Sequence, residues 1–145
     1  MGLADADSME HGVASGNYVI VPVSCPAPKG PGSPALSTGG QVRFKPGSRL
    51  AAIYGAAEAR EEYFCNYEVN PDFTPRLEQA GLTVTAWGAQ GEPRAVELNG
   101  HPFFLATLFQ PQLTSGATQM PHPVIVAFLK AAREFQRARV RKPAS

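Results

Sequence analysis

Apolar and polar residues follow one another along this chain in a pattern that predicts more strands than helices. Residues 17–25 are β-branched and strongly apolar, which is typical of a buried strand. Residues 121–139 carry apolar side chains near helical spacing behind a proline, so they predict an amphipathic helix. Gly81 stands where a short helix over 71–80 needs a left-handed C-cap. The whole pattern predicts those two helices, strands over 17–25, 41–44, 50–54, 62–69 and 103–109, and a hairpin of 82–87 with 95–98.

The length of 145 residues fits a single domain over 1–145, large enough to bury an ordinary core. Residues 26–40 form a Pro/Gly/Ser-rich stretch that predicts a loop without regular structure. Residues 1–16 are small and acidic, and they resemble the frayed end of a helix that runs into a loop. Residues 140–145 predict a disordered tail.

Composition narrows the class of protein. Hydrophobic residues make up 43% of the chain and charged residues 17%, a profile typical of a soluble globular protein. The formal charge of +1 gives no electrostatic reason to expect nucleic acid or a membrane surface as a partner. No apolar run approaches the roughly 20 residues of a membrane-spanning helix, and no signal peptide opens the chain. We therefore expect a cytoplasmic protein.

Cysteine and histidine offer little local chemistry. Cys25 and Cys65 are the two cysteines, and neither has the CxxC spacing of a redox or zinc site, so we expect reduced thiols. His101 and His122 each precede a proline, where capping a turn or packing at a strand entry is the expected role. The sequence predicts no metal site and no cofactor.

Three motifs carry more information together than any of them does alone. They are GGQVRF with PGSRLAAIYG (39–55), EEYFCNYEVN (61–70) and ELNGHPFFLATLFQPQL (97–113). In order and spacing they resemble the glutaminase domain of CTP synthase, a class I glutamine amidotransferase, whose second motif also ends in YEVN. The resemblance implies an α/β, flavodoxin-like three-layer fold, of which this chain carries only the C-terminal portion. The chain is also similar to free-standing proteins related to the C-terminal region of CTP synthase, some of which are labelled selenoproteins.

The third motif departs from that family at the residues that do the chemistry. The family reads HPFF and then QFHPE, and its His and Glu complete a Cys-His-Glu triad. Gln110 and Gln112 replace that His and Glu. An amide cannot take a proton from a thiol near neutral pH, and it cannot stabilise an imidazolium. Two neighbouring amides can instead hydrogen-bond one another. The family's nucleophile elbow and oxyanion glycines have no counterpart here, and Cys25 lacks the flanking glycines of an elbow.

The second motif has also lost the family's basic side chains. Arg and His residues that help to hold glutamine in the family become Phe64, Cys65 and Asn66. The resemblance leaves Asn66, Tyr67 and Glu68 as candidate ligand-binding residues and Cys65 as a candidate thiol.

Three functions remain open. The first is a non-catalytic relative of the CTP synthase glutaminase domain that binds a partner, or a small amide or nucleotide-like ligand. The second is a glutamine amidotransferase or CTP synthase activity that a missing N-terminal half completes, in pyrimidine nucleotide metabolism. The third is a thiol-dependent function at Cys65. Because half of a doubly wound sheet leaves a bare apolar edge and face, we expect either a homo-oligomer or an upstream segment to cover it. The sequence does not decide whether Met1 is the true start.

Overall fold

The computed structural model describes residues 4–12, 16–115 and 120–140. The predicted disordered tail therefore lies outside the described residues beyond residue 140, as do parts of the acidic N-terminal stretch. Within the described ranges, no helix has the length and apolar character needed to cross a membrane.

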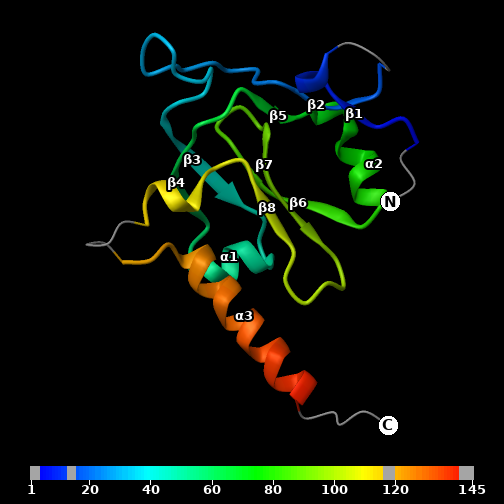
Figure 1. Cartoon of the computed structure of the whole chain (residues 1–145), viewed down its shortest axis with the longest axis vertical. Coiled ribbons are helices and arrows are strands. Elements are labelled where there is room, and N and C mark those ends of the chain that lie inside the picture. Colours follow the sequence, from blue (N-terminus) through cyan, green and yellow to red (C-terminus); the bar gives the residue numbers. More distant parts are fainter. Residues whose placement is uncertain (1–3, 13–15, 116–119, 141–145) are drawn as a thin grey trace.

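Two sheets form the body of the protein (Figure 1). The larger sheet has five strands in the order β4-β3-β6-β7-β8, and every neighbouring pair in it is antiparallel. The smaller sheet has three strands in the order β1-β2-β5. The larger sheet comprises β3 (Gly39–Phe44), β4 (Glu58–Glu62), β6 (Leu82–Trp87), β7 (Pro93–Leu98) and β8 (Leu105–Thr107), and the smaller one β1 (Asp7–Ser8), β2 (Tyr18–Pro22) and β5 (Tyr67–Val69).

The helices are short except for the last one. Helix α2 (Thr74–Gln79) follows the 3₁₀ turn η2 (Pro71–Phe73), and Gly81 after it has a φ of 88°, as predicted from the sequence. Helix α3 (Pro123–Val140) is the predicted amphipathic helix, and Figure 1 shows it running away from the two sheets. Two further 3₁₀ turns are η1 (Met9–His11) and η3 (Pro111–Leu113).

The prediction of a strand over 50–54 is wrong, because these residues form helix α1 (Arg49–Tyr54). The Ser48 hydroxyl accepts a hydrogen bond from the Ala51 N–H at 3.1 Å and caps the first turn. Gly55 closes the helix in the left-handed conformation, with its N–H on the Ala51 carbonyl at 2.9 Å. A five-residue apolar run suits a helix or a strand equally well, so the two caps decide.

The predicted strand over 62–69 is interrupted, because β4 ends at Glu62 and β5 begins at Tyr67. Between them the chain crosses from the larger sheet to the smaller one and bonds to the 26–40 loop and the residues before β3. The Tyr63 N–H donates to the Thr38 carbonyl at 3.0 Å, and Cys65 exchanges two backbone hydrogen bonds with Leu36 at 2.8 and 2.9 Å. The strands predicted over 17–25 and 103–109 are present but shorter, as β2 and β8.

The larger sheet is covered on both faces. On one face, β3 packs its Val42 against α1 and α3, together with Phe109, which is 1% exposed. On the other face, Val84 and Val96 pack with Leu77 of α2 and with aliphatic side chains of the smaller sheet. Residues two apart in a regular strand lie on the same face of a sheet. A register shift in β6 between Val84 and Ala86 breaks this rule, so Val84 lies in one core and Ala86 in the other.

Candidate functional site

The second and third motifs meet at Gln110, although 45 residues separate Gln110 from Cys65. The Gln110 N–H donates to the Glu62 carbonyl at 2.9 Å, which ties the end of the β8 segment to the end of β4. Its side-chain Nε2 donates to the Phe64 carbonyl at 2.9 Å and lies 3.6 Å from the Cys65 Sγ. Gln110 and the candidate thiol of Cys65 are therefore direct neighbours.

The two glutamine side chains are bonded to each other. Gln112 Nε2 donates to Gln110 Oε1 at 3.2 Å, so the hydrogen bond expected between the amides is present. Gln112 lies in η3, directly after the short β8 segment. The resulting series of contacts runs from Gln112 to Gln110 and on to Cys65 and Phe64, and it contains neither an imidazole nor a carboxylate.

Cys65 has neither an imidazole nor a cation at hydrogen-bonding distance in the part of the chain that the structure describes. Its thiol is half-buried and donates weakly to the Leu108 carbonyl at 3.5 Å. The three imidazoles are occupied elsewhere, at Asp7, at the Phe103 N–H and at Glu61. Thiolate formation at Cys65 therefore has no local base to assist it.

The candidate ligand-binding residues have different surroundings. Asn66 is exposed, and its side-chain oxygen accepts from the Ala35 N–H at 2.8 Å. Tyr67 pairs with Pro22 across the smaller sheet and is half-buried. Glu68 is only 1% exposed, and both its oxygens already accept hydrogen bonds, so a ligand at Glu68 would have to displace protein donors.

The partners of Glu68 form a buried ionic network that the sequence reading missed. Arg94 Nη1 lies 2.8 Å from Glu68 Oε2, and its Nη2 lies 2.6 Å from Glu92 Oε1. The remaining oxygens of the two carboxylates accept backbone N–H groups, from Ser24 at 2.7 Å and Gln90 at 2.8 Å. The signal available beforehand was an arginine within the apolar strand segment PRAVEL, where a buried cation needs an anionic partner.

A second buried cluster joins β4, α1 and the start of α3. His122 Nε2 lies 3.1 Å from Glu61 Oε2, and its Nδ1 accepts from the Val124 N–H at 3.2 Å, which fixes the ring proton on Nε2. The Tyr54 hydroxyl also donates to Glu61. Burial, the hydrogen bond to Glu61 and the charge of Glu61 all raise the pKa of Tyr54 well above its usual range. His122 caps the start of α3 through its contact with the Val124 N–H, whereas the expected role was to cap a turn or to pack at a strand entry.

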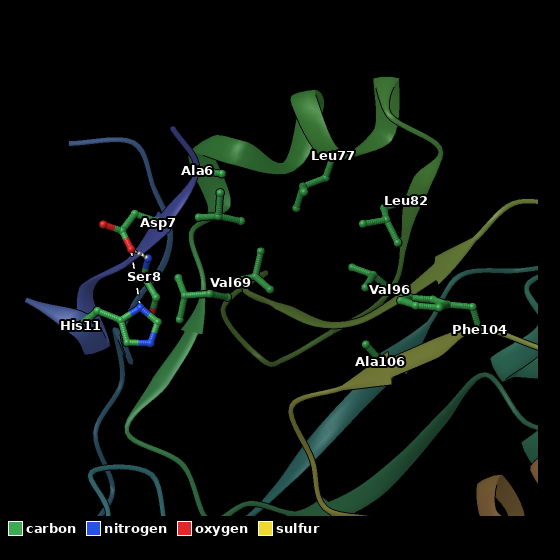
Figure 2. A pocket seen from close by; sticks show the side chains of 12 residues that line it. Ala6, Asp7, Ser8, His11, Val69, Leu77, Leu82, Val96, Phe104 and Ala106 are labelled. Carbon is green, nitrogen blue, oxygen red and sulfur yellow. Dashed lines mark hydrogen bonds and ion pairs between the residues drawn. The ribbon is translucent and has the colours of Figure 1, made fainter. Parts of the chain in front are cut away.

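A large hollow among the described residues lies away from the glutamine pair and Cys65. It has a volume of about 780 Å³ and lies between the smaller sheet, α2 and the β6-β7-β8 side of the larger sheet (Figure 2). Its walls are mostly aliphatic, with Phe104 among them, and Asp7, Ser8 and His11 stand at one end of it. Such an apolar groove suits the burial of apolar surface better than the binding of a charged metabolite.

The described residues offer no metal site, because no group of three or more His, Cys, Asp or Glu side chains converges among them. Cys25 is half-buried, with its Sγ 2.8 Å from Gln90 Oε1. It lies in the loop after β2, with no elbow geometry around it.

Known proteins with similar sequences are CTP synthases. No family model matches the chain. The CTP synthase of Hyphomonas neptunium is 41% identical over 92 residues, which cover 63% of this chain and 17% of that protein. The CTP synthase of Aeropyrum pernix is 45% identical over 97 residues, covering 66% of this chain and 18% of that protein. The chain thus spans less than a fifth of the length of these relatives.

A solved structure extends the likeness to nearly the whole chain. The glutaminase domain of Trypanosoma brucei CTP synthase, solved with acivicin bound, superposes with a TM-score of 0.78 at 28% identity. The match covers 92% of this chain and 52% of that one. The fold is accordingly that of a class I glutamine amidotransferase, as the motifs predicted. Within this class, the chain is a CTP synthase glutaminase-like domain.

Proposed function

We propose that this chain is a non-catalytic relative of the CTP synthase glutaminase domain, with a binding or regulatory role. The observation that carries the proposal is the amide pair, in which Gln112 Nε2 donates to Gln110 Oε1 at 3.2 Å. Glutamine hydrolysis by a thiol needs a base that takes the thiol proton and a carboxylate that orients this base. Both positions hold neutral amides that are hydrogen-bonded to each other, and loss of such a base costs several orders of magnitude in rate.

The ligand that this proposal assigns to the glutamine pair is a small amide, because the two side chains present amide donors and acceptors at the surface. The apolar groove is a separate surface with a different chemical preference. The glutamine pair and the apolar groove both suit a protein that binds a ligand or partner without converting a substrate. The similarity to CTP synthase suggests that this binding serves pyrimidine nucleotide metabolism.

An assay of ammonia release from glutamine tests the proposal, with an active CTP synthase glutaminase assayed in parallel. We expect no turnover above the blank, either from the chain itself or from a Gln110→His/Gln112→Glu double variant. The double variant restores the two side chains of the family and leaves the nucleophile missing. Robust turnover by the unaltered chain would refute the non-catalytic assignment. Calorimetric titration with glutamine in the same buffer reports whether an amide binds at all.

The second hypothesis, an activity completed by another half of the domain, draws support from the 52% share of the T. brucei domain that this chain matches. It requires ammonia release to appear when the unmatched part of that domain is added. The third hypothesis, thiol chemistry at Cys65, requires alkylation of Cys65 to be fast and pH-dependent near neutrality. Slow labelling, comparable with that of Cys25, would remove it.

A further inference from the structure

The connection from β7 to β8 contains the dipeptide Asn99-Gly100. Both residues are exposed, and they follow directly after β7 ends at Leu98. Gly100 has a φ of 75°, in the left-handed region that favours glycine. No side chain at Gly100 stands between its backbone nitrogen and the Asn99 carboxamide, so the two groups can react with each other.

The Gly100 nitrogen is free to act as a nucleophile. Its N–H donates no hydrogen bond to any of the described residues. The preceding N–H, that of Asn99, donates to the Gly81 carbonyl at 3.0 Å and anchors the start of the turn. Attack by the Gly100 nitrogen therefore breaks no backbone hydrogen bond.

One side chain restrains the Asn99 carboxamide. Asn99 Nδ2 donates to Thr83 Oγ1 at 3.1 Å, and the Thr83 hydroxyl lies 3.4 Å from Asn99 Oδ1. Both contacts are exposed, so water competes for them. They slow the rotation of the carboxamide toward the Gly100 nitrogen, but they do not prevent it.

No other asparagine in the sequence combines these features. Asn70 precedes Pro71, whose nitrogen carries no hydrogen and cannot act as the nucleophile. Asn17 and Asn66 each precede a tyrosine, whose side chain crowds the backbone nitrogen. The Asn66 side-chain oxygen also accepts from the Ala35 N–H at 2.8 Å. The chain thus provides its own comparison sites for the reactivity of Asn99.

We propose that Asn99 is a site of spontaneous deamidation whose rate is limited by the contact with Thr83. The Gly100 nitrogen loses its proton to hydroxide and attacks Asn99 Cγ, the Cγ–Nδ2 bond breaks, and ammonia leaves with a proton from water. Water then opens the five-membered succinimide at either carbonyl and gives aspartate or isoaspartate. The net reaction consumes one water and releases one ammonia. It is independent of whether the chain hydrolyses glutamine.

Either product alters the connection between the two strands. Both carry one more negative charge than asparagine, which takes the formal net charge of the chain from +1 to zero. In isoaspartate the backbone runs through the side chain, which adds one carbon atom between Glu97 and Leu105, the strand pair nearest the turn. Because loop length helps to set the register of paired strands, isoaspartate should weaken the pairing of β7 with β8.

Peptide mass spectrometry of the full chain, incubated at neutral and at mildly alkaline pH, tests the proposal. We expect NH₂ to be replaced by OH at Asn99, with separate aspartate and isoaspartate products. The reaction should be faster at alkaline pH, because the Gly100 nitrogen must lose its proton. The other asparagines should stay intact over the same period. Thr83→Ala removes the restraint and should accelerate the reaction by roughly two- to tenfold, the factor that one ordinary hydrogen bond is worth.

Two further variants serve as controls. Thr114→Ala removes a hydroxyl that donates to the Pro111 carbonyl at 3.4 Å, beyond the other end of β8, and should leave the rate unchanged. Asn99→Gln should abolish the reaction at this position, because its longer side chain would have to close a larger ring. Circular dichroism checks that all three variants are folded.

Three outcomes would overturn the proposal. The first is a full chain that keeps Asn99 intact for as long as a synthetic peptide of residues 95–103 takes to deamidate. The second is deamidation of Asn17 or Asn66 that is as fast as that of Asn99. The third is a rate that Thr83→Ala leaves unchanged.

Discussion

Replacement of Arg94 by methionine should destabilise the fold strongly, because it removes the one cation from a buried ionic network. The side chains of Arg94, Glu68 and Glu92 are 4%, 1% and 9% exposed, so water cannot replace the lost charge. Methionine keeps much of the apolar stem of arginine, so the change creates little empty volume. Its main effect is to leave two carboxylates buried without a counter-ion.

The expected loss is about 3–5 kcal/mol, the range found when one partner of a buried ion pair is removed. A domain of this size has a total stability on the order of 5–15 kcal/mol, so the variant loses roughly a fifth or more of it. The melting temperature should fall by roughly 10 °C. Urea unfolding followed by circular dichroism measures the loss directly. Neutralising both acids as well, in Arg94→Met/Glu68→Gln/Glu92→Gln, should recover at least half of it, since the buried charges are then gone.

The exposed ion pair of Lys29 with Glu62 provides the control. Its atoms lie 3.6 Å apart, with the side chains 67% and 33% exposed. Lys29→Ala should therefore cost less than about 1 kcal/mol. If Arg94→Met costs no more than Lys29→Ala, or if neutralising the two glutamates gives no recovery, the buried network does not stabilise the fold in the way argued.

Three further predictions concern stability. Gly88→Ala should cost about 1–3 kcal/mol in urea unfolding, because its Cβ would meet Glu92 Oε1 at 2.2 Å within the fixed network. Gly39→Ala is the control. Its Cβ would meet the more mobile Glu62 Oε1 at 2.4 Å, so it should cost clearly less. Ser48→Ala removes the cap of α1 and should cost about 1 kcal/mol. Ser33→Ala is the control and should cost less, because the Ser33 hydroxyl bonds only to Gly30 within an exposed loop. Burial raises the pKa of Tyr63 above its usual range, so the folded state keeps this proton when the unfolded state loses it. The contribution of Tyr63 to stability should therefore be complete below about pH 10 and fall above it by up to about 1.4 kcal/mol per pH unit. Tyr54, whose pKa is also raised, adds to the fall in the same way, and Tyr63→Phe should make the total fall shallower.

The sequence predicted the elements whose local signals agree with their long-range pairing. The hairpin of β6 and β7, the stop at Gly81 and the amphipathic α3 are examples, because alternation, turn residues and helical spacing pointed the same way. The strand predicted over 50–54 failed because a short apolar run suits either state, and the caps at Ser48 and Gly55 were not weighed. The continuous strand over 62–69 failed for a different reason. Its break at residues 63–66 is set by hydrogen bonds to the segment 35–38, which no local pattern reveals.

The candidate site was predicted only in part, because its contacts join segments that are distant in sequence. The resemblance to CTP synthase brought the Gln110 and Cys65 segments into one site, and the structure places Gln110 Nε2 3.6 Å from the Cys65 Sγ. The buried partners of Glu68 and His122 were missed, since Arg94 and Glu61 come from strands distant in sequence. Single-sequence reasoning identifies a buried ionic residue without identifying what neutralises it.

The residues that this chain shares with the glutaminase motifs of CTP synthase hold its fold together. In the YEVN motif, Glu68 belongs to the buried network, and Asn70 caps η2 while its Nδ2 donates to the Tyr18 carbonyl at 2.9 Å. In the HPFF motif, His101 accepts from the Phe103 N–H at 3.2 Å and so caps a turn. At Gln110, the contact that anchors the residue to β4 is made by its backbone, which any side chain would permit. The shared residues hold the scaffold. Similarity in this chain therefore reports the fold, and the fold alone does not decide the activity.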